Sequence, residues 1–135
     1  MFGRRKQPPI RSLIGEGTVV EGTIRFSEGL RVDGQVVGDV VAEDAHPSVL
    51  VLSEKGSVSG KVDASHVIIN GTVEGPVVSR HLLELQPKAR IVGDVSYHSL
   101  EMHQGACIQG SMRKLSDEDR QPLQLLAPAP DKASA

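Results

Sequence analysis

The sequence predicts an all-β fold, a three-sided parallel β-helix of about six turns, and two observations carry this prediction. First, an aliphatic residue, a spacer, a glycine, a spacer and a second apolar residue recur six times, with 15 to 22 residues between successive glycines. Second, most copies follow a short stretch in which apolar and polar residues alternate, as in a strand with one buried face. A hairpin meander does not explain such a period, whereas stacked coils do. The glycines are Gly22, Gly38, Gly60, Gly75, Gly93 and Gly110.

Each turn of the predicted coil has about six residues on each of three sides, and turns stack about 4.8 Å apart. The strands around the glycines are expected at residues 20–24, 36–40, 58–62, 73–77, 91–95 and 108–112. The strands before them are expected at residues 30–32, 50–52, 67–69, 83–85 and 100–102. The longest interval, between Gly38 and Gly60, predicts a loop inserted at residues 42–47.

The central glycine of each motif indicates a bent side or a narrow interior, with the glycine pointing inward between its aliphatic neighbours. An ordinary turn glycine is the alternative. The composition fits a narrow aliphatic interior, because aromatic residues make up only 2% of the chain. A single cysteine, Cys107, excludes an intrachain disulfide and a cysteine metal cluster. No stretch approaches the roughly 20 apolar residues of a transmembrane helix.

Charge and proline divide the chain into three predicted parts. Residues 1–14 form a disordered basic tail with four basic residues and no acid, and residues 15–112 form the β-helix domain, with 7 basic and 13 acidic residues. Residues 113–135 form a disordered, proline-containing tail with equal numbers of acids and bases. The acidic domain argues against nucleic acid as the main partner, because phosphate binding needs a basic surface.

The segments LIGEGTVVEGTI, at residues 13–24, and LRVDGQVVGDV, at residues 30–40, resemble the bactofilin family of bacterial cytoskeletal proteins. The resemblance extends from residue 14 to residue 112 and includes the six turns and the short polar tails. It implies a right-handed β-helix and a non-enzymatic scaffold, which forms filaments by end-to-end contact without nucleotide. It also implies a cytoplasmic location at the inner face of the cytoplasmic membrane, with cell-wall synthesis or remodelling enzymes as partners. In agreement, the sequence has no Gly-x4-Gly-Lys-Ser/Thr phosphate loop.

The N-terminal tail is a candidate membrane contact. Its start is similar to the membrane-targeting leader of part of the family, and basic residues contribute about 1 kcal/mol each near an anionic surface. Many leaders on one filament would add their effects. The alternative is a solvated basic tail. The membrane-targeting residues are predicted to be Phe2, Arg4, Arg5 and Lys6.

The two ends of the coil are predicted to be apolar stacking faces for further copies, because a β-helix end exposes unpaired backbone N–H and C=O groups. The alternative is that the same residues only fill the interior and that the tails cover the ends. The predicted interface residues are Val20, Ile24 and Phe26 in the first turn, and Leu100, Met102, Ile108 and Met112 in the last.

Two other functions stay open. One is a left-handed β-helix enzyme, either a hexapeptide acyltransferase or a zinc enzyme, and the other is a non-polymerising adaptor. His66, His81 and His98 recur near the period of the turns and would suit zinc if they met in a column. They are interpreted as exposed corner residues, and Cys107 as a small residue at the surface or half-buried. The irregular period argues against a hexapeptide repeat, and no catalytic residue, cofactor or metal site is predicted.

Overall fold

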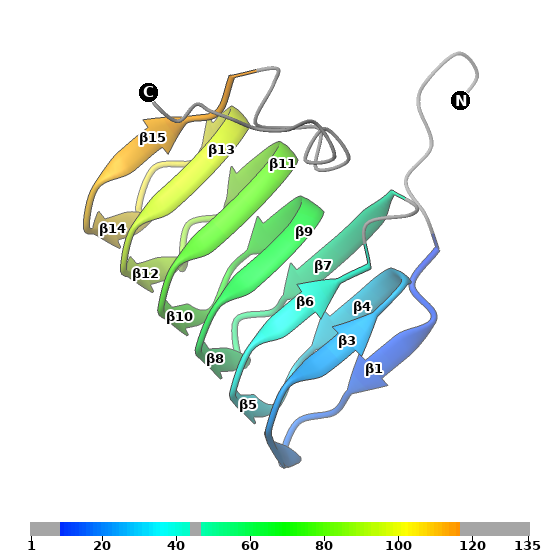
Figure 1. Ribbon diagram of the computed structural model, residues 1–135. Helices are drawn as coiled ribbons and strands as arrows, with labels where there is room; N and C mark the ends of the chain where they lie inside the picture. Colours follow the sequence, from blue (N-terminus) through cyan, green and yellow to red (C-terminus); the bar gives the residue numbers. More distant parts are fainter. Residues whose placement is uncertain (1–8, 44–46, 117–135) are drawn as a thin grey trace.

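The computed structural model describes residues 9–43 and 47–116, and all the regular structure in these ranges is β-strand. Figure 1 shows the strands stacked side by side along one axis. Most have three to five residues, whereas β9, β11 and β13 have eight or nine. The strands are β1 (Ser12–Ile14), β2 (Val19–Glu21), β3 (Ile24–Phe26), β4 (Glu28–Val32), β5 (Gln35–Val37), β6 (Val40–Ala42), β7 (Ser48–Leu52), β8 (Ser57–Ser59), β9 (Val62–Ile69), β10 (Thr72–Glu74), β11 (Val77–Leu85), β12 (Arg90–Val92), β13 (Val95–Met102), β14 (Cys107–Gln109) and β15 (Met112–Lys114).

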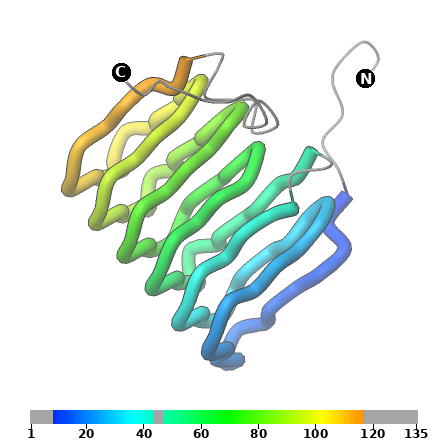
Figure 2. The backbone as a smooth tube through the Cα atoms, viewed as in Figure 1, coloured from blue at the N-terminus to red at the C-terminus, as the bar shows by residue number. Residues whose placement is uncertain are grey.

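The strands of the described residues form three faces of one coil, and their pairings are parallel. Face A is the six-stranded sheet of β2, β5, β8, β10, β12 and β14. Face B consists of β3, β6, β15 and the first halves of β9, β11 and β13. Face C consists of β1, β4, β7 and the second halves of the same three long strands. Figure 2 shows the backbone winding through these faces turn after turn, which confirms the predicted parallel β-helix of about six turns.

Most of the interior is built from columns of equivalent aliphatic residues, one from each turn. On face A the column runs through the centre of every strand, and its inner members are fully buried. The strand alternation places such residues inward, and stacking removes their apolar surface from water at about 25 cal/mol per Å². Aliphatic side chains of similar size therefore fill the coil without a large aromatic core. The face A column is Val20, Val36, Val58, Val73, Ile91 and Ile108.

The repeated glycines form the corner between face A and face B. Gly38 has φ +149° and Gly75 has φ +150°, a backbone conformation that residues with a side chain rarely adopt. A Cβ on Gly38 would lie 2.1 Å from the carbonyl oxygen of Gly22 in the preceding turn. The interpretation as a bend is thereby confirmed. The expectation that the glycine points inward is wrong, because the missing side chain would be directed along the stack.

The predicted insertion falls between the end of β6 on face B and the start of β7 on face C, and its residues 44–46 lie outside the described residues. β6 and β7 pair with successive halves of the continuous strand β9, so residues 43–47 are extra at a corner that later turns pass without a break. This confirms the predicted insertion. Strands extend from Ser12 to Lys114, and Leu115 is only 5% exposed. The division into a β-helix and two tails stays a prediction, and most of both tails lies outside the described residues.

Candidate functional site at the two ends of the β-helix

The first turn has an unpaired backbone edge. β1, β2 and β3 pair with strands of the second turn, and within the described residues they have no strand on their other side. The carbonyl of Val37 accepts a hydrogen bond from the amide of Gly22 in the turn before, at 2.9 Å. The equivalent carbonyl in the first turn belongs to Glu21, for which no earlier turn exists in the described part of the chain. This edge is therefore available for further pairing.

The last turn offers both donors and acceptors. The amide of Gly93 donates to the carbonyl of Gln109 at 2.9 Å, and the equivalent amide of Gly110 has no later turn to bond with in residues 9–43 and 47–116. The carbonyl of Met102 also lacks a partner from a later turn in these residues. It is equivalent to the carbonyl of Leu85, which accepts a hydrogen bond from the amide of His103. A strand added at this end would satisfy both kinds of group.

The side chains predicted for the first-turn interface begin inward-facing columns. Val20 begins the column of face A and Ile24 the first column of face B, and both are half-buried. Phe26 is 7% exposed and belongs to the buried core, so it offers little open surface. The structure thus brings the three residues to one end, with Val20 and Ile24 the more accessible.

The side chains predicted for the last-turn interface are the final members of inward-facing columns. Leu100 and Ile108 are half-buried and pack against the core. Met102 is 47% exposed and Met112 is 41% exposed, although the residues below them in their columns, Leu85 and Val95, are buried. The last turn therefore exposes apolar side chains that every internal turn covers.

The predicted membrane-targeting residues Phe2, Arg4, Arg5 and Lys6 lie outside the described residues. The part of the chain that the structure describes has no helix of the length and hydrophobicity needed to cross a membrane.

Comparison with known proteins agrees with this geometry. A family model described as bactofilin, polymer-forming cytoskeletal, matches residues 12–113. The chain belongs to the bactofilin family. Bactofilins are structural proteins that form polymers, which makes self-association and a non-enzymatic role the expected properties of this member.

Two bactofilins of Myxococcus xanthus (strain DK1622) are similar to this chain. Bactofilin BacO is 28% identical over 111 residues, which cover 82% of this chain and 85% of BacO. Bactofilin BacP is 25% identical over 99 residues, which cover 73% of this chain and only 40% of BacP. The comparison with solved structures gives no significant match.

The three histidines of this bactofilin lie at the corner between faces B and C in successive turns. The rings of His66 and His81 have their centroids 5.0 Å apart and are tilted by 37°. His98 occupies the corner of the next turn, in β13. The interpretation as corner residues is therefore confirmed, but the expectation that they are exposed is wrong, because all three are half-buried. Zinc binding by these histidines stays an open alternative. Cys107 is half-buried on face A, where it stacks on Arg90.

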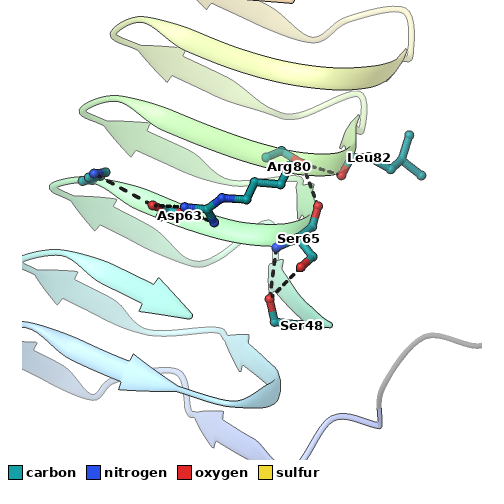
Figure 3. A network of polar contacts seen from close by, with 7 residues as sticks. Ser48, Asp63, Ser65, Arg80 and Leu82 are labelled. Atoms are coloured by element: carbon teal, nitrogen blue, oxygen red, sulfur yellow. Dashed lines mark hydrogen bonds and ion pairs between the residues drawn. The ribbon is translucent and has the colours of Figure 1, made fainter. Parts of the chain in front are cut away.

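An ion pair that reaches from this corner onto face B is the feature that sequence reasoning missed (Figure 3). Both terminal nitrogens of Arg80 donate to the carboxylate of Asp63 in the preceding turn, one of them at 3.2 Å. The side chains are 23% and 10% exposed. A two-pronged contact of this kind orients the guanidinium as well as neutralising the carboxylate.

Serines continue this polar corner below and beside the ion pair. The amide of Ser65 donates to the hydroxyl oxygen of Ser48 at 3.0 Å. The fully buried Ser79 hydroxyl lies 2.7 Å from the carbonyl of Leu82 and 3.1 Å from that of Ser65, and its proton can be donated to either. These bonds satisfy backbone groups where the chain turns from face B to face C.

Proposed function

We propose that this bactofilin assembles into filaments without nucleotide, through end-to-end contact of its β-helices. The observation that supports the proposal most directly is the state of the two ends. Within residues 9–43 and 47–116, each end combines a row of backbone groups that have no strand to pair with and the terminal members of aliphatic columns. An edge of this kind is a template for pairing with another chain, and most proteins that stay monomeric block it.

Burial provides the driving force. Internal members of the columns, such as Val36 and Val73, are fully buried, whereas Met102 and Met112 are substantially exposed. Covering a large apolar side chain contributes about 1.5–3 kcal/mol. A copy stacked on an end would bury several such side chains and pair backbone groups at the same time. No nucleotide is needed for either contribution.

The test places a charge at an end and, in a control, on a side. Ile108→Lys places an ammonium group at the last position of the face A column. Met112→Lys places one at a more exposed position of the same turn, on face B. Val92→Lys is the matched control, because Val92 points outward from face A and is already 48% exposed. Negative-stain electron microscopy in plain buffer should show filaments for the wild type and for Val92→Lys, and none for the two end variants.

Circular dichroism must show the same β-structure in all four proteins, so that lost filaments reflect a changed end and not unfolding. Filaments that persist in both end variants would contradict stacking through this end. A wild type that stays small and monodisperse would favour the adaptor or enzyme alternatives instead.

We further propose that the filament lies at the inner face of the cytoplasmic membrane and positions cell-wall synthesis or remodelling enzymes. The basic leader supports the membrane contact, because residues 1–14 carry four positive charges and no acid while the β-helix is acidic. Anionic lipid would therefore attract the leader and repel the body. The proposal for the enzyme partners rests on membership of the family.

A further inference from the structure

A cluster of two glutamates and a histidine lies on the outer surface of face C, near the last turn. Glu84 in β11 and Glu101 in β13 are in-register neighbours, and His103 follows two residues after Glu101. The Nε2 atom of His103 lies 3.3 Å from Oε2 of Glu84. One ligand atom from each of the three side chains lies within 4.8 Å of the other two. The fold thus brings three metal-binding side chains together from two turns.

No lysine or arginine of the described residues forms an ion pair with these two glutamates. Like charges directly opposite one another on neighbouring strands destabilise a sheet. The structure records ion pairs for other acidic residues near face C, since Glu16 pairs with Lys55 and Glu54 with Lys88. Among the described residues, the only ion pair of Glu84 is with the imidazole of His103, and no ion pair is found for Glu101. A cation held between the carboxylates would remove this repulsion.

The outward-facing residues at equivalent positions of the face C strands form a column. The composition of this column explains why the cluster of acids lies near the last turn. Its four earlier members carry one basic and three apolar side chains, so no other pair of acids is stacked in this column. The column runs Leu13, Arg31, Val51, Ile68, Glu84 and Glu101.

We propose that Glu84, Glu101 and His103 bind a divalent transition-metal ion, represented by Zn²⁺. A ligand set of carboxylate oxygens and an imidazole nitrogen suits zinc, manganese or iron, whereas calcium and magnesium prefer ligand sets of oxygen alone. Zinc–ligand distances of about 2.0–2.2 Å place tetrahedral ligands roughly 3.3 Å apart. The distance of 3.3 Å between His103 and Glu84 fits this geometry.

Gln86 acts as a positioning residue for this site. Its Nε2 atom donates to Oε2 of Glu84 at 3.3 Å and thereby limits the rotation of the carboxylate. Three protein ligands leave a fourth position for water or another donor. Because Glu101 lies in the last strand of face C and His103 directly follows that strand, while Glu84 belongs to the strand before, the ion would tie the final turn to its neighbour.

The experiment is a zinc-binding measurement by equilibrium dialysis with elemental analysis, on untagged full-length protein first stripped with EDTA. Dialysis is suitable whether or not the protein is assembled. The site variants are His103→Gln and Glu101→Gln. The controls are His81→Gln, which interrupts the histidine column, and Glu74→Gln, which removes an exposed carboxylate on face A. Circular dichroism checks that all variants keep their β-structure.

We expect the wild type and both controls to bind one Zn²⁺ per chain, and both site variants to bind it at least tenfold more weakly. Co²⁺ bound to the wild type should show visible absorption bands of a low-symmetry site, and these should be absent in His103→Gln. Three results would each overturn the assignment: no stoichiometric binding by the wild type, unchanged affinity in His103→Gln, or loss of binding in His81→Gln.

Discussion

Asp63 and Arg80 form an ion pair between neighbouring turns at a place where β11 contains one more residue than the strands on either side of it. The register of β11 shifts between Ser79 and Leu82 against both β9 and β13. An extra residue of this kind bends a strand and redirects a side chain. Here the result is that Arg80 reaches the largely buried carboxylate of Asp63, which would otherwise have only the weaker contact with Lys61 at 3.9 Å.

We predict that Arg80→Ala lowers the free energy of unfolding by about 2 kcal/mol, because it leaves the carboxylate of Asp63 largely buried and without its main partner. Arg90→Ala, at an exposed position of face A, should change it by less than about 0.5 kcal/mol. Urea denaturation measures both, in a shared Ile108→Lys background so that assembly does not contribute. Equal effects of the two substitutions would show that the ion pair adds no stability.

The corner glycines should differ in their tolerance of alanine according to two separate causes. Gly75→Ala combines a positive φ with a Cβ only 2.2 Å from the carbonyl oxygen of Gly60, and we expect it to cost about 3 kcal/mol or more. Gly22→Ala has the positive φ but nothing within 4 Å, and should cost about 1–2 kcal/mol. Gly15→Ala has neither feature and should be nearly neutral. Thermal unfolding of the three variants gives the order, and a Gly22→Ala variant as unstable as Gly75→Ala would contradict the role of the close contact.

The sequence predicts the coil well because the coil depends on features that repeat. Inward residues such as Val36 and Val58 must be aliphatic in every turn, and the corner must be glycine in every turn, so both leave a period that can be read directly. The contacts between unlike side chains do not repeat. Asp63 and Arg80 are 17 residues apart, and so are Glu84 and Glu101, but their meeting depends on the register and on the extra residue in β11. Such pairs become predictable only after the turns have been aligned residue by residue.

Acid should weaken the fold partly through two aspartates whose pKa values lie below the ordinary value of 3.8. Hydrogen bonds from the backbone amide and then the hydroxyl of Ser111 lower the pKa of Asp94. The nearby hydroxyl of Ser53 and, to a smaller extent, the hydrogen bond and charge of Arg31 lower the pKa of Asp33. A lowered pKa in the folded state stabilises the protein above the unfolded value, and this contribution is lost as the pH falls through the folded value. The loss should therefore begin near pH 3.8 and continue below it.

The variant that tests this combines Asp94→Asn with Asp33→Asn, which keeps the shape of both side chains and removes their titration. Thermal unfolding between pH 6 and pH 2.5 should show a shallower loss of stability in acid for the double variant than for the wild type. Glu74→Gln, at an exposed carboxylate on face A, is the control and should follow the wild type. Identical curves for the double variant and the wild type would remove these two carboxylates as a source of acid sensitivity.

Membrane binding should depend on the leader, on anionic lipid and on assembly together. Deletion of residues 2–6 removes Phe2 and three of the four N-terminal basic residues, so sedimentation with vesicles containing phosphatidylglycerol should fall to the level seen with neutral vesicles. Raising the salt concentration should weaken binding of the full chain, because screening shortens the reach of the charges.

The Ile108→Lys variant keeps the leader but should also bind weakly, since a single leader lacks the combined effect of many on a filament. Samples without vesicles must be sedimented in parallel, because filaments can pellet by themselves. Equal vesicle-dependent pelleting with and without residues 2–6 would show that the leader is an ordinary solvated tail.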